Sequence, residues 1–189
     1  MNAAVSTEVR PEVSISTWNI DPVHSTAQFK VKHMMISNVK GEFTSVTGSL
    51  ELNNNDITKS KVEASIDATT INTRDSQRDA HLKSADFFDV EKFPAISFKS
   101  TSISQQTPGE LTVTGDLTIH GVTREVVFDV EGPSMPQKDP WGNTRIGFSA
   151  TTRINRKDFG LTWNTALETG GILVGDEVTI SLDVEFVRA

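Results

Sequence analysis

The chain has 189 residues, enough for one domain with a sizeable hydrophobic core. Its net charge of -7 and its scattered basic residues exclude the concentrated positive surface that is typical of nucleic-acid-binding proteins. Cysteine is absent, which excludes disulfides, thiolate metal sites and a cysteine nucleophile. Since no run of about eighteen apolar residues occurs, we predict no transmembrane segment.

Residues 1–17 are rich in Ser, Thr, Glu and Val and predict a flexible N-terminal tail, followed by one domain over residues 18–189. The first residues lack a basic segment followed by an apolar one, so they do not match a secretory signal. We therefore expect a cytoplasmic protein. A periplasmic location is the alternative if a signal has been removed.

The first half of the chain alternates apolar and polar residues, a period typical of strands with one buried face. Pro22 has no N–H to donate, so residues 18–24 predict an edge or entry segment rather than a central strand. The strands predicted after it are 25–33, 39–52 and 61–68.

Alternation gives way to helical spacing over residues 74–88, which contain no Gly, Pro or β-branched residue. Asn72 or Thr73 can cap the start of this segment. We therefore predict one short helix over residues 74–88, with an aromatic C-terminal end.

The second half returns to alternation. Residues 111–130 form the clearest unit, since two alternating runs flank a short turn that contains Gly121, as in an antiparallel hairpin. Residues 94–103, 143–154 and 176–187 predict further strands, and the Gly-rich residues 163–175 predict a long loop.

About eight strands, one helix and no βαβ alternation indicate an all-β, antiparallel protein. A sandwich and a closed barrel are both compatible with this pattern. A barrel of about eight strands can hold one small ligand, and the helix and the 163–175 loop could then cover one end.

A series of short motifs is spread over residues 18–180: Trp18-x-Ile-Asp-x-x-His-Ser25, Phe29-x-Val-x-His33, Val39-x-Gly-x-Phe43, Arg74-Asp75, His81-Leu-Lys-Ser-x-Asp-Phe-Phe-Asp89, Phe93-Pro-x-Ile-x-Phe98, Leu117-Thr-Ile-His-Gly-Val-Thr-Arg124, Trp141-Gly-Asn-x-Arg-x-Gly-Phe148, Ile154-Asn-Arg-x-Asp-Phe-Gly-Leu161 and Val174-Gly-Asp-x-Val-x-Ile180. In their order and spacing these motifs resemble the YceI family of bacterial, lipocalin-like polyisoprenoid-binding proteins.

This resemblance implies an eight-stranded lipocalin-like barrel with the helix near its mouth. It implies binding, and sequestration or transport, of an isoprenoid or other long-chain lipid, such as a quinone or a prenyl phosphate. Apart from such a bound lipid or quinone we expect no cofactor. A homodimer could form through the helix or through edge strands.

Apolar strand faces supply the candidate cavity wall, and burial of an apolar tail supplies roughly 25 cal/mol per Å² without polar contacts. The same residues could equally fill a solid core. His33 falls on this face, either to contact a ligand head group or as a neutral, hydrogen-bonded histidine. The candidate wall residues are Phe29, Val31, His33, Phe43, Ile66, Phe98, Leu117, Ile119, Phe128, Phe148, Ile180 and Leu182.

Two groups of residues are candidates for the mouth of the cavity. Arg74 and Arg78 stand in the first turns of the predicted helix, where N–H groups and guanidinium donors could hold a phosphate head group. The alternative is pairing of Arg74 with a nearby Asp. Aromatic residues beside connections form the second group, as mouth residues or as ordinary caps of the barrel end: Phe87, Phe88, Phe159 and Trp163.

A salt bridge between Arg156 and Asp158 is expected to fix the loop that leads to Trp163. We predict no metal site, because the histidines show no spacing that would bring three ligands to one surface. No catalytic motif occurs, so we expect a binding protein. The alternative is an enzyme that modifies such a lipid, with His33 or Asp86 as acid or base.

Overall fold

The computed structural model describes residues 13–168 and 170–189. Residues 1–12 of the predicted tail lie outside the described residues. The first strand, β1, already begins at Ile15. Residues 15–17 therefore belong to the sheet, and the predicted tail boundary is wrong at this point.

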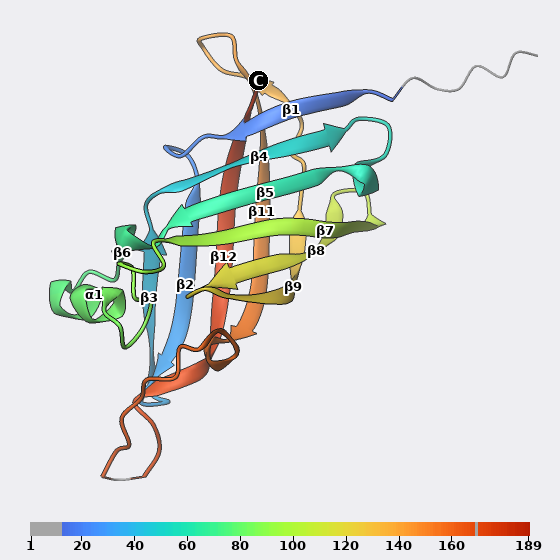
Figure 1. The fold of residues 1–189 in the computed structure, drawn as a ribbon. Helices are drawn as coiled ribbons and strands as arrows, with labels where there is room; N and C mark the ends of the chain where they lie inside the picture. Colours follow the sequence, from blue (N-terminus) through green and yellow to red (C-terminus); the bar gives the residue numbers. More distant parts are fainter. Residues whose placement is uncertain (1–12, 169) are drawn as a thin grey trace, which may run out of the picture.

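The described chain consists of strands with one α-helix and three short 3₁₀ helices (Figure 1). In chain order the elements are β1 (Ile15–Ile20), β2 (Thr26–His33), β3 (Ser37–Phe43), β4 (Val46–Asn53), η1 (Ile57–Lys59), β5 (Lys61–Asp67), η2 (Ala68–Thr70), β6 (Ile71–Asn72), α1 (Ser76–Lys83), β7 (Ala95–Thr107), β8 (Glu110–Ile119), β9 (Val122–Glu131), β10 (Gln137–Lys138), β11 (Thr144–Asn155), η3 (Arg156–Phe159) and β12 (Val174–Arg188).

Eight strands close into an antiparallel barrel, which confirms the predicted fold. The circuit runs through β1, β4, β5, β7, β8, β9, β11 and β12, and the pairing of β12 with β1 completes it. The strands β2, β3 and β6 extend the sheet beyond β12, and β10 extends it beyond β11.

The additional strands arise mainly because three long strands are interrupted. The breaks lie at residues 21–25, at residues 44–45 and at η2, and they separate β1 from β2, β3 from β4 and β5 from β6. Pro22 lies in the first break, where it costs no ladder hydrogen bond. The β1 strand itself pairs with both β4 and β12, so the expectation of an edge segment is wrong.

The β11 and β12 strands are not interrupted in this way. They pair over eleven consecutive residues, from Arg145 opposite Val187 to Asn155 opposite Glu177. This long ribbon runs the length of the barrel (Figure 1). It therefore connects the two ends of the molecule.

The helix α1 is shorter than predicted at both ends. Asp75 caps it by accepting hydrogen bonds from the N–H groups of Gln77 and Arg78, in place of the expected Asn72 or Thr73. Its last turn closes where the Ser84 N–H donates to the carbonyl of His81. Over the described residues, no helix has the length and apolar character to cross a membrane.

Candidate functional site

The barrel interior contains a cavity of about 260 Å³. The surface that the described residues expose to it is apolar, although Gln28, Ser60, Ser97 and Arg156 stand among the lining residues. The alternation of apolar and polar residues thus encloses a hollow space and does not only fill a solid core. This hollow interior is the candidate ligand site.

Eleven of the twelve predicted wall residues line this cavity. They come from strands on all sides of the barrel and its extension: Phe29, Val31, Phe43, Ile66, Phe98, Leu117, Ile119, Phe128, Phe148, Ile180 and Leu182. The exception is His33. It is the last residue of β2, pairs with Ser37 and Val174, and does not line the cavity, so its assignment to the wall is wrong.

Further wall residues escaped the sequence analysis although they follow the same alternation. Val113 and Val130 share faces with predicted wall residues of β8 and β9, and Ala150 and Val184 do so on β11 and β12. They could have been identified as every second residue on the inward-facing side of each strand. Small side chains such as Ala150 belong to the wall as well as large ones, because they leave the interior hollow.

Pairs of phenylalanine rings stiffen the wall. The ring centroids lie 5.2 Å apart for Phe98 and Phe128, and 5.7 Å apart for Phe148 and Phe186, both at near-perpendicular angles. Gly41 lies opposite Phe29 in the ladder, and a Cβ atom there would come within 2.4 Å of the Phe29 ring. Gly41 therefore makes room for Phe29 in the wall.

The helix α1 and the turns after it cover one end of the cavity. Leu82, Phe87 and Phe88 from this segment line the interior. Trp163 does not line it but packs against Phe87 and His81, with ring centroids 5.3 and 4.7 Å apart. We call His81, Phe87 and Trp163 the mouth cluster.

A hydrogen bond joins the mouth cluster to the turn after α1. His81 Nε2 lies 2.8 Å from Asp86 Oδ2. Both side chains are partly exposed. The cluster therefore lies between solvent and the apolar interior.

Arg156 anchors the segment that carries Trp163. It is buried, and its guanidinium donates to the carbonyls of Gly175 at 2.8 Å and Trp163 at 2.9 Å. A third bond, of 2.5 Å, reaches the carbonyl of Leu161. Burial lowers the pKa of Arg156, and a nearby carboxylate opposes this shift.

The carboxylate beside Arg156 belongs to Asp176, at 3.4 Å. The predicted salt bridge with Asp158 is therefore wrong, although the expected role of fixing the loop holds. Phe159 is also misassigned to the mouth. It is only 1% exposed and packs in the core without lining the cavity.

Arg74 and Arg78 do not line the cavity either. Arg78 donates from Nε to the Thr73 hydroxyl and from Nη2 to the Thr73 carbonyl, each at 2.8 Å. Arg74 is exposed, with a left-handed φ of 64°. Since the Asp75 carboxylate already occupies the N–H groups of the first helical turn, the structure does not support a phosphate site at this helix start.

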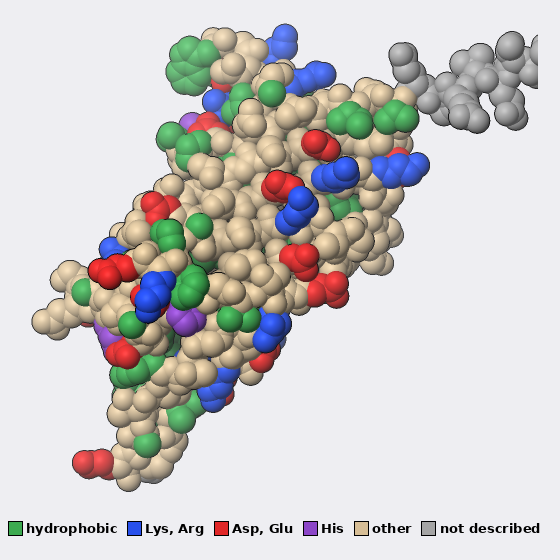
Figure 2. All heavy atoms as spheres, viewed as in Figure 1, with side chains coloured by type: hydrophobic (Ala, Val, Ile, Leu, Met, Phe, Trp, Pro, Cys, Tyr) green, Lys and Arg blue, Asp and Glu red, His purple; other side chains and the backbone are tan. Residues whose placement is uncertain are grey.

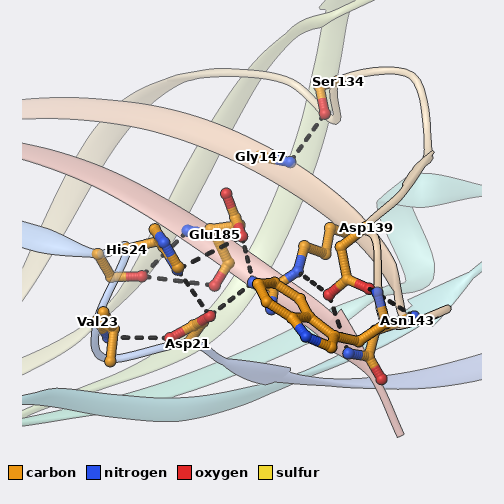
Figure 3. A network of polar contacts seen from close by, with 11 residues as sticks. Asp21, Val23, His24, Ser134, Asp139, Asn143, Gly147 and Glu185 are labelled. Atoms are coloured by element: carbon orange, nitrogen blue, oxygen red, sulfur yellow. Dashed lines mark hydrogen bonds and ion pairs between the residues drawn. The ribbon is translucent and has the colours of Figure 1, made fainter.

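The opposite end of the barrel contains a charged network around Arg145 (Figure 3). Its Nη1 donates to Asp21 at 2.6 Å and to Glu185, and its Nε donates to Asp139 at 2.8 Å. Hydrogen bonds from Arg145 and His24 hold the pKa of Asp21 well below its ordinary range. Those from Asn143 and Arg145 do the same for the pKa of Asp139.

The same three carboxylates raise the pKa of Arg145 above its ordinary value. Asp21, His24 and Glu185 each place a potential metal-ligand atom within 4.8 Å of the others. The guanidinium of Arg145 already supplies positive charge among them. The network is therefore an ion-pair cluster that needs no metal ion and that links β11 and β12 to residues 21–24.

Comparison with known proteins agrees with this architecture. A family model described as a YceI-like domain matches residues 18–186. A UPF0312 protein of Staphylococcus aureus (strain MSSA476) is 39% identical over 172 residues, which cover 91% of this chain and 98% of that protein.

Two solved structures have the same fold. The Campylobacter jejuni YceI protein is 31% identical, with a TM-score of 0.70 over 84% of this chain and 90% of that one. A domain from Saccharophagus degradans, described as polyisoprenoid-binding, is 12% identical with a TM-score of 0.66 over 93% of this chain and 100% of that one. The motif resemblance is confirmed: the chain belongs to the YceI-like domain family.

Proposed function

We propose that this protein binds a long-chain apolar molecule, of isoprenoid or alkyl type, inside its barrel and thereby sequesters or carries it. The observation that carries the proposal is the hollow interior of about 260 Å³ with an apolar inner surface. The fold shared with a domain described as polyisoprenoid-binding supports the same ligand class.

An empty apolar cavity is energetically unfavourable. At about 24 cal/mol per Å³, a void of about 260 Å³ corresponds to roughly 6 kcal/mol of lost packing and transfer energy. An apolar chain that fills the space recovers part of this energy. Binding therefore needs no polar contact inside the barrel.

The apolar inner surface of the cavity also determines where the polar head group of a ligand can lie. A quinone ring or a phosphate buried in the interior would lose its hydrogen bonds to water without replacement. The volume also lies just below the range of about 300–1,000 Å³ that is typical of ligand sites. A long chain would therefore place its tail inside and its head group at the mouth cluster.

An enzyme that modifies such a lipid is less well supported. Its proposed acid or base was His33 or Asp86, and neither lines the cavity. Asp86 is instead hydrogen-bonded to His81. Binding without chemical change requires only the cavity itself.

Solvent extraction of the purified protein, followed by mass spectrometry, tests the proposal. We expect a lipid with a long apolar chain in the extract, at up to one molecule per barrel in native mass spectra. Ala150→Phe, which projects a ring into the cavity, should lower the lipid content severalfold. If well-folded protein takes up neither endogenous lipid nor an added isoprenoid alcohol, the proposal is wrong.

A matched pair of substitutions tests whether the space is hollow in solution. Ala150 lines the cavity, whereas Ala68 is fully buried without lining it. Ala68→Leu should therefore lower the free energy of unfolding by about 1–3 kcal/mol through overpacking. Ala150→Leu should cost clearly less in urea denaturation, since it extends into free volume.

A further inference from the structure

The hairpin of β2 and β3 ends in an apolar tip exposed to solvent. Met34, Met35 and Ile36 form this tip and are 38%, 63% and 79% exposed. Met35 and Ile36 in particular gain little from burial in the fold. We call these three residues the hairpin tip.

The backbone of the hairpin tip is also unfavourable for its residues. Met34 and Met35 have φ values of 51° and 58°, and the Ile36 N–H donates to the His33 carbonyl at 3.0 Å. Met34 and Met35 are the central residues of the turn that this bond closes, and two successive positive φ values there are typical of type I′, which strongly prefers Asn-Gly. Neither burial in the fold nor the conformation of the turn therefore explains apolar residues at this tip. Their presence indicates a contact with something outside the fold.

Basic residues cover the outer face of the same hairpin. Lys30, Lys32 and Lys40 are exposed, and Lys30 lies directly opposite Lys40. Like charges in such a pair destabilise a hairpin. Among the described residues, none of the three lysines forms an ion pair.

Acidic groups near these lysines are few or already paired. Glu42 is the single acidic residue of the hairpin sequence, at the end far from the tip. On the neighbouring β12, Asp176 pairs with Lys157 at 2.9 Å and Glu177 approaches Arg153 to 4.0 Å. The outer face of the hairpin is thus locally positive on a protein of net charge -7.

The hairpin tip lies at the mouth end of the molecule. The Met34 N–H donates to the Leu173 carbonyl at 2.8 Å, and the adjacent Val174 pairs with His33 and lines the cavity. Figure 1 shows the ends of β2 and β3 beside the segment that precedes β12. Apolar side chains are exposed at this lower end in Figure 2.

We propose that the hairpin tip docks on an anionic lipid bilayer. Met34, Met35 and Ile36 enter the interface between head groups and acyl chains, and the lysines face the lipid phosphates. An apolar tip backed by positive charge matches the chemistry of such a surface. Docking itself is independent of the cavity, and only its purpose, which is to bring the mouth to a source of lipid, rests on the proposed function.

Sedimentation with vesicles tests the docking. The full chain is mixed with phosphatidylcholine vesicles that contain 30% phosphatidylglycerol, and with vesicles of phosphatidylcholine alone. We expect binding to the anionic vesicles that weakens as salt is raised. Replacement of each of Lys30, Lys32 and Lys40 by Gln should weaken this binding by about fivefold.

The triple variant Met34→Asn, Met35→Gly, Ile36→Thr removes the apolar tip but supplies the residues that the turn prefers. It should keep or raise the melting temperature and lose vesicle binding by at least about tenfold. Met135→Asn is the matched control, because Met135 is 81% exposed in the chain segment before β10. This control should bind vesicles like the unchanged protein.

Three results would overturn docking: no binding to anionic vesicles, undiminished binding by the triple variant, or a dimer that the triple variant converts to monomer without any effect on vesicles. The last result would make the hairpin tip a contact between protein chains. Lipid content measured by extraction of the triple variant separates this outcome from a failure of the cavity proposal.

Discussion

Two arginines mark the two ends of the β11 strand and are used in opposite ways. Arg145, near the start of the strand, bonds the carboxylates of Asp21, Asp139 and Glu185. Arg156, immediately after its end, bonds mainly backbone carbonyls. They lie about 36 Å apart along the chain at about 3.3 Å per residue.

Because the two arginines have different partners, the two ends of the barrel are stabilised by different kinds of interaction. The ion pairs between Arg145 and its carboxylates depend on pH and salt. Hydrogen bonds from a buried guanidinium to carbonyls do not titrate in the accessible range, since arginine remains protonated. Acid should therefore weaken the end that contains Arg145 first and leave the anchor at the mouth intact.

Loss of the mouth anchor should have the largest effect. Arg156→Met leaves the carbonyls of Leu161, Trp163 and Gly175 without their donor, and we expect a loss of about 3–5 kcal/mol in the free energy of unfolding. Urea denaturation measures this loss. Arg153→Met is the matched control, because Arg153 is exposed and should cost less than about 0.5 kcal/mol. Equal effects of the two substitutions would refute the anchoring role.

Loss of the opposite arginine should change the response to acid. The folded-state pKa values of Asp21 and Asp139 lie below their unfolded values near 3.8. Their contribution to stability is therefore complete above that value and is lost as the pH falls through the lower, folded-state values.

Arg145→Met removes the main cation of the network, so both carboxyl pKa values should rise towards normal. The free energy of unfolding should then fall less steeply between pH 5 and pH 2 than in the unchanged protein, from a lower value at pH 7. Denaturation curves recorded over this pH range test the expectation. An unchanged slope would show that the network contributes nothing to acid sensitivity.

A pair of tryptophans extends the comparison to ligand exchange. Trp163 belongs to the mouth cluster, whereas Trp141 is 81% exposed beside Asp139 of the Arg145 network. Trp163→Ala should cost about 1–2 kcal/mol through lost ring contacts and speed the exchange of a fluorescent lipid severalfold. Trp141→Ala should change neither quantity. Similar exchange rates in both variants would mean that the ligand does not pass the mouth cluster.

The smallest effect is expected at the edge of the mouth cluster. Asp86→Asn weakens the bond to His81, but both side chains are partly exposed, at 39% and 55%. Exposed pairs of this kind contribute about 0–1 kcal/mol. Thermal melts of Asp86→Asn and of Glu63→Gln, which weakens the exposed pair with Lys99, should therefore shift by similarly small amounts.

Alternation along the sequence predicted most of the cavity wall because a strand has only two faces. Residues of the inward phase on β2 meet residues of the inward phase on β12, since Phe29 lies opposite Ile180 and Val31 lies opposite Val178. The argument fails at His33, which continues the phase but lies where β2 ends. Alternation shows which way a side chain points and does not show where the cavity stops.

The anchor of the mouth could not be predicted in the same way. The partners of Arg156 are mostly backbone carbonyls, which every residue carries and which leave no mark in the sequence. Its acidic partner, Asp176, lies twenty residues away along the chain, whereas the sequence alone favours the nearby Asp158. Interactions of this kind become visible only when the chain path is known.

The seam between β1 and β12 has a consequence for synthesis. Trp18, Asn19 and Ile20 pair with Arg188, Val187 and Phe186, so the barrel joins residues from the beginning and the end of the domain. Such distant pairing is slow, because a long loop must close before the contacts form. During translation the earlier strands must wait, with their apolar faces exposed, until residues 186–188 have left the ribosome.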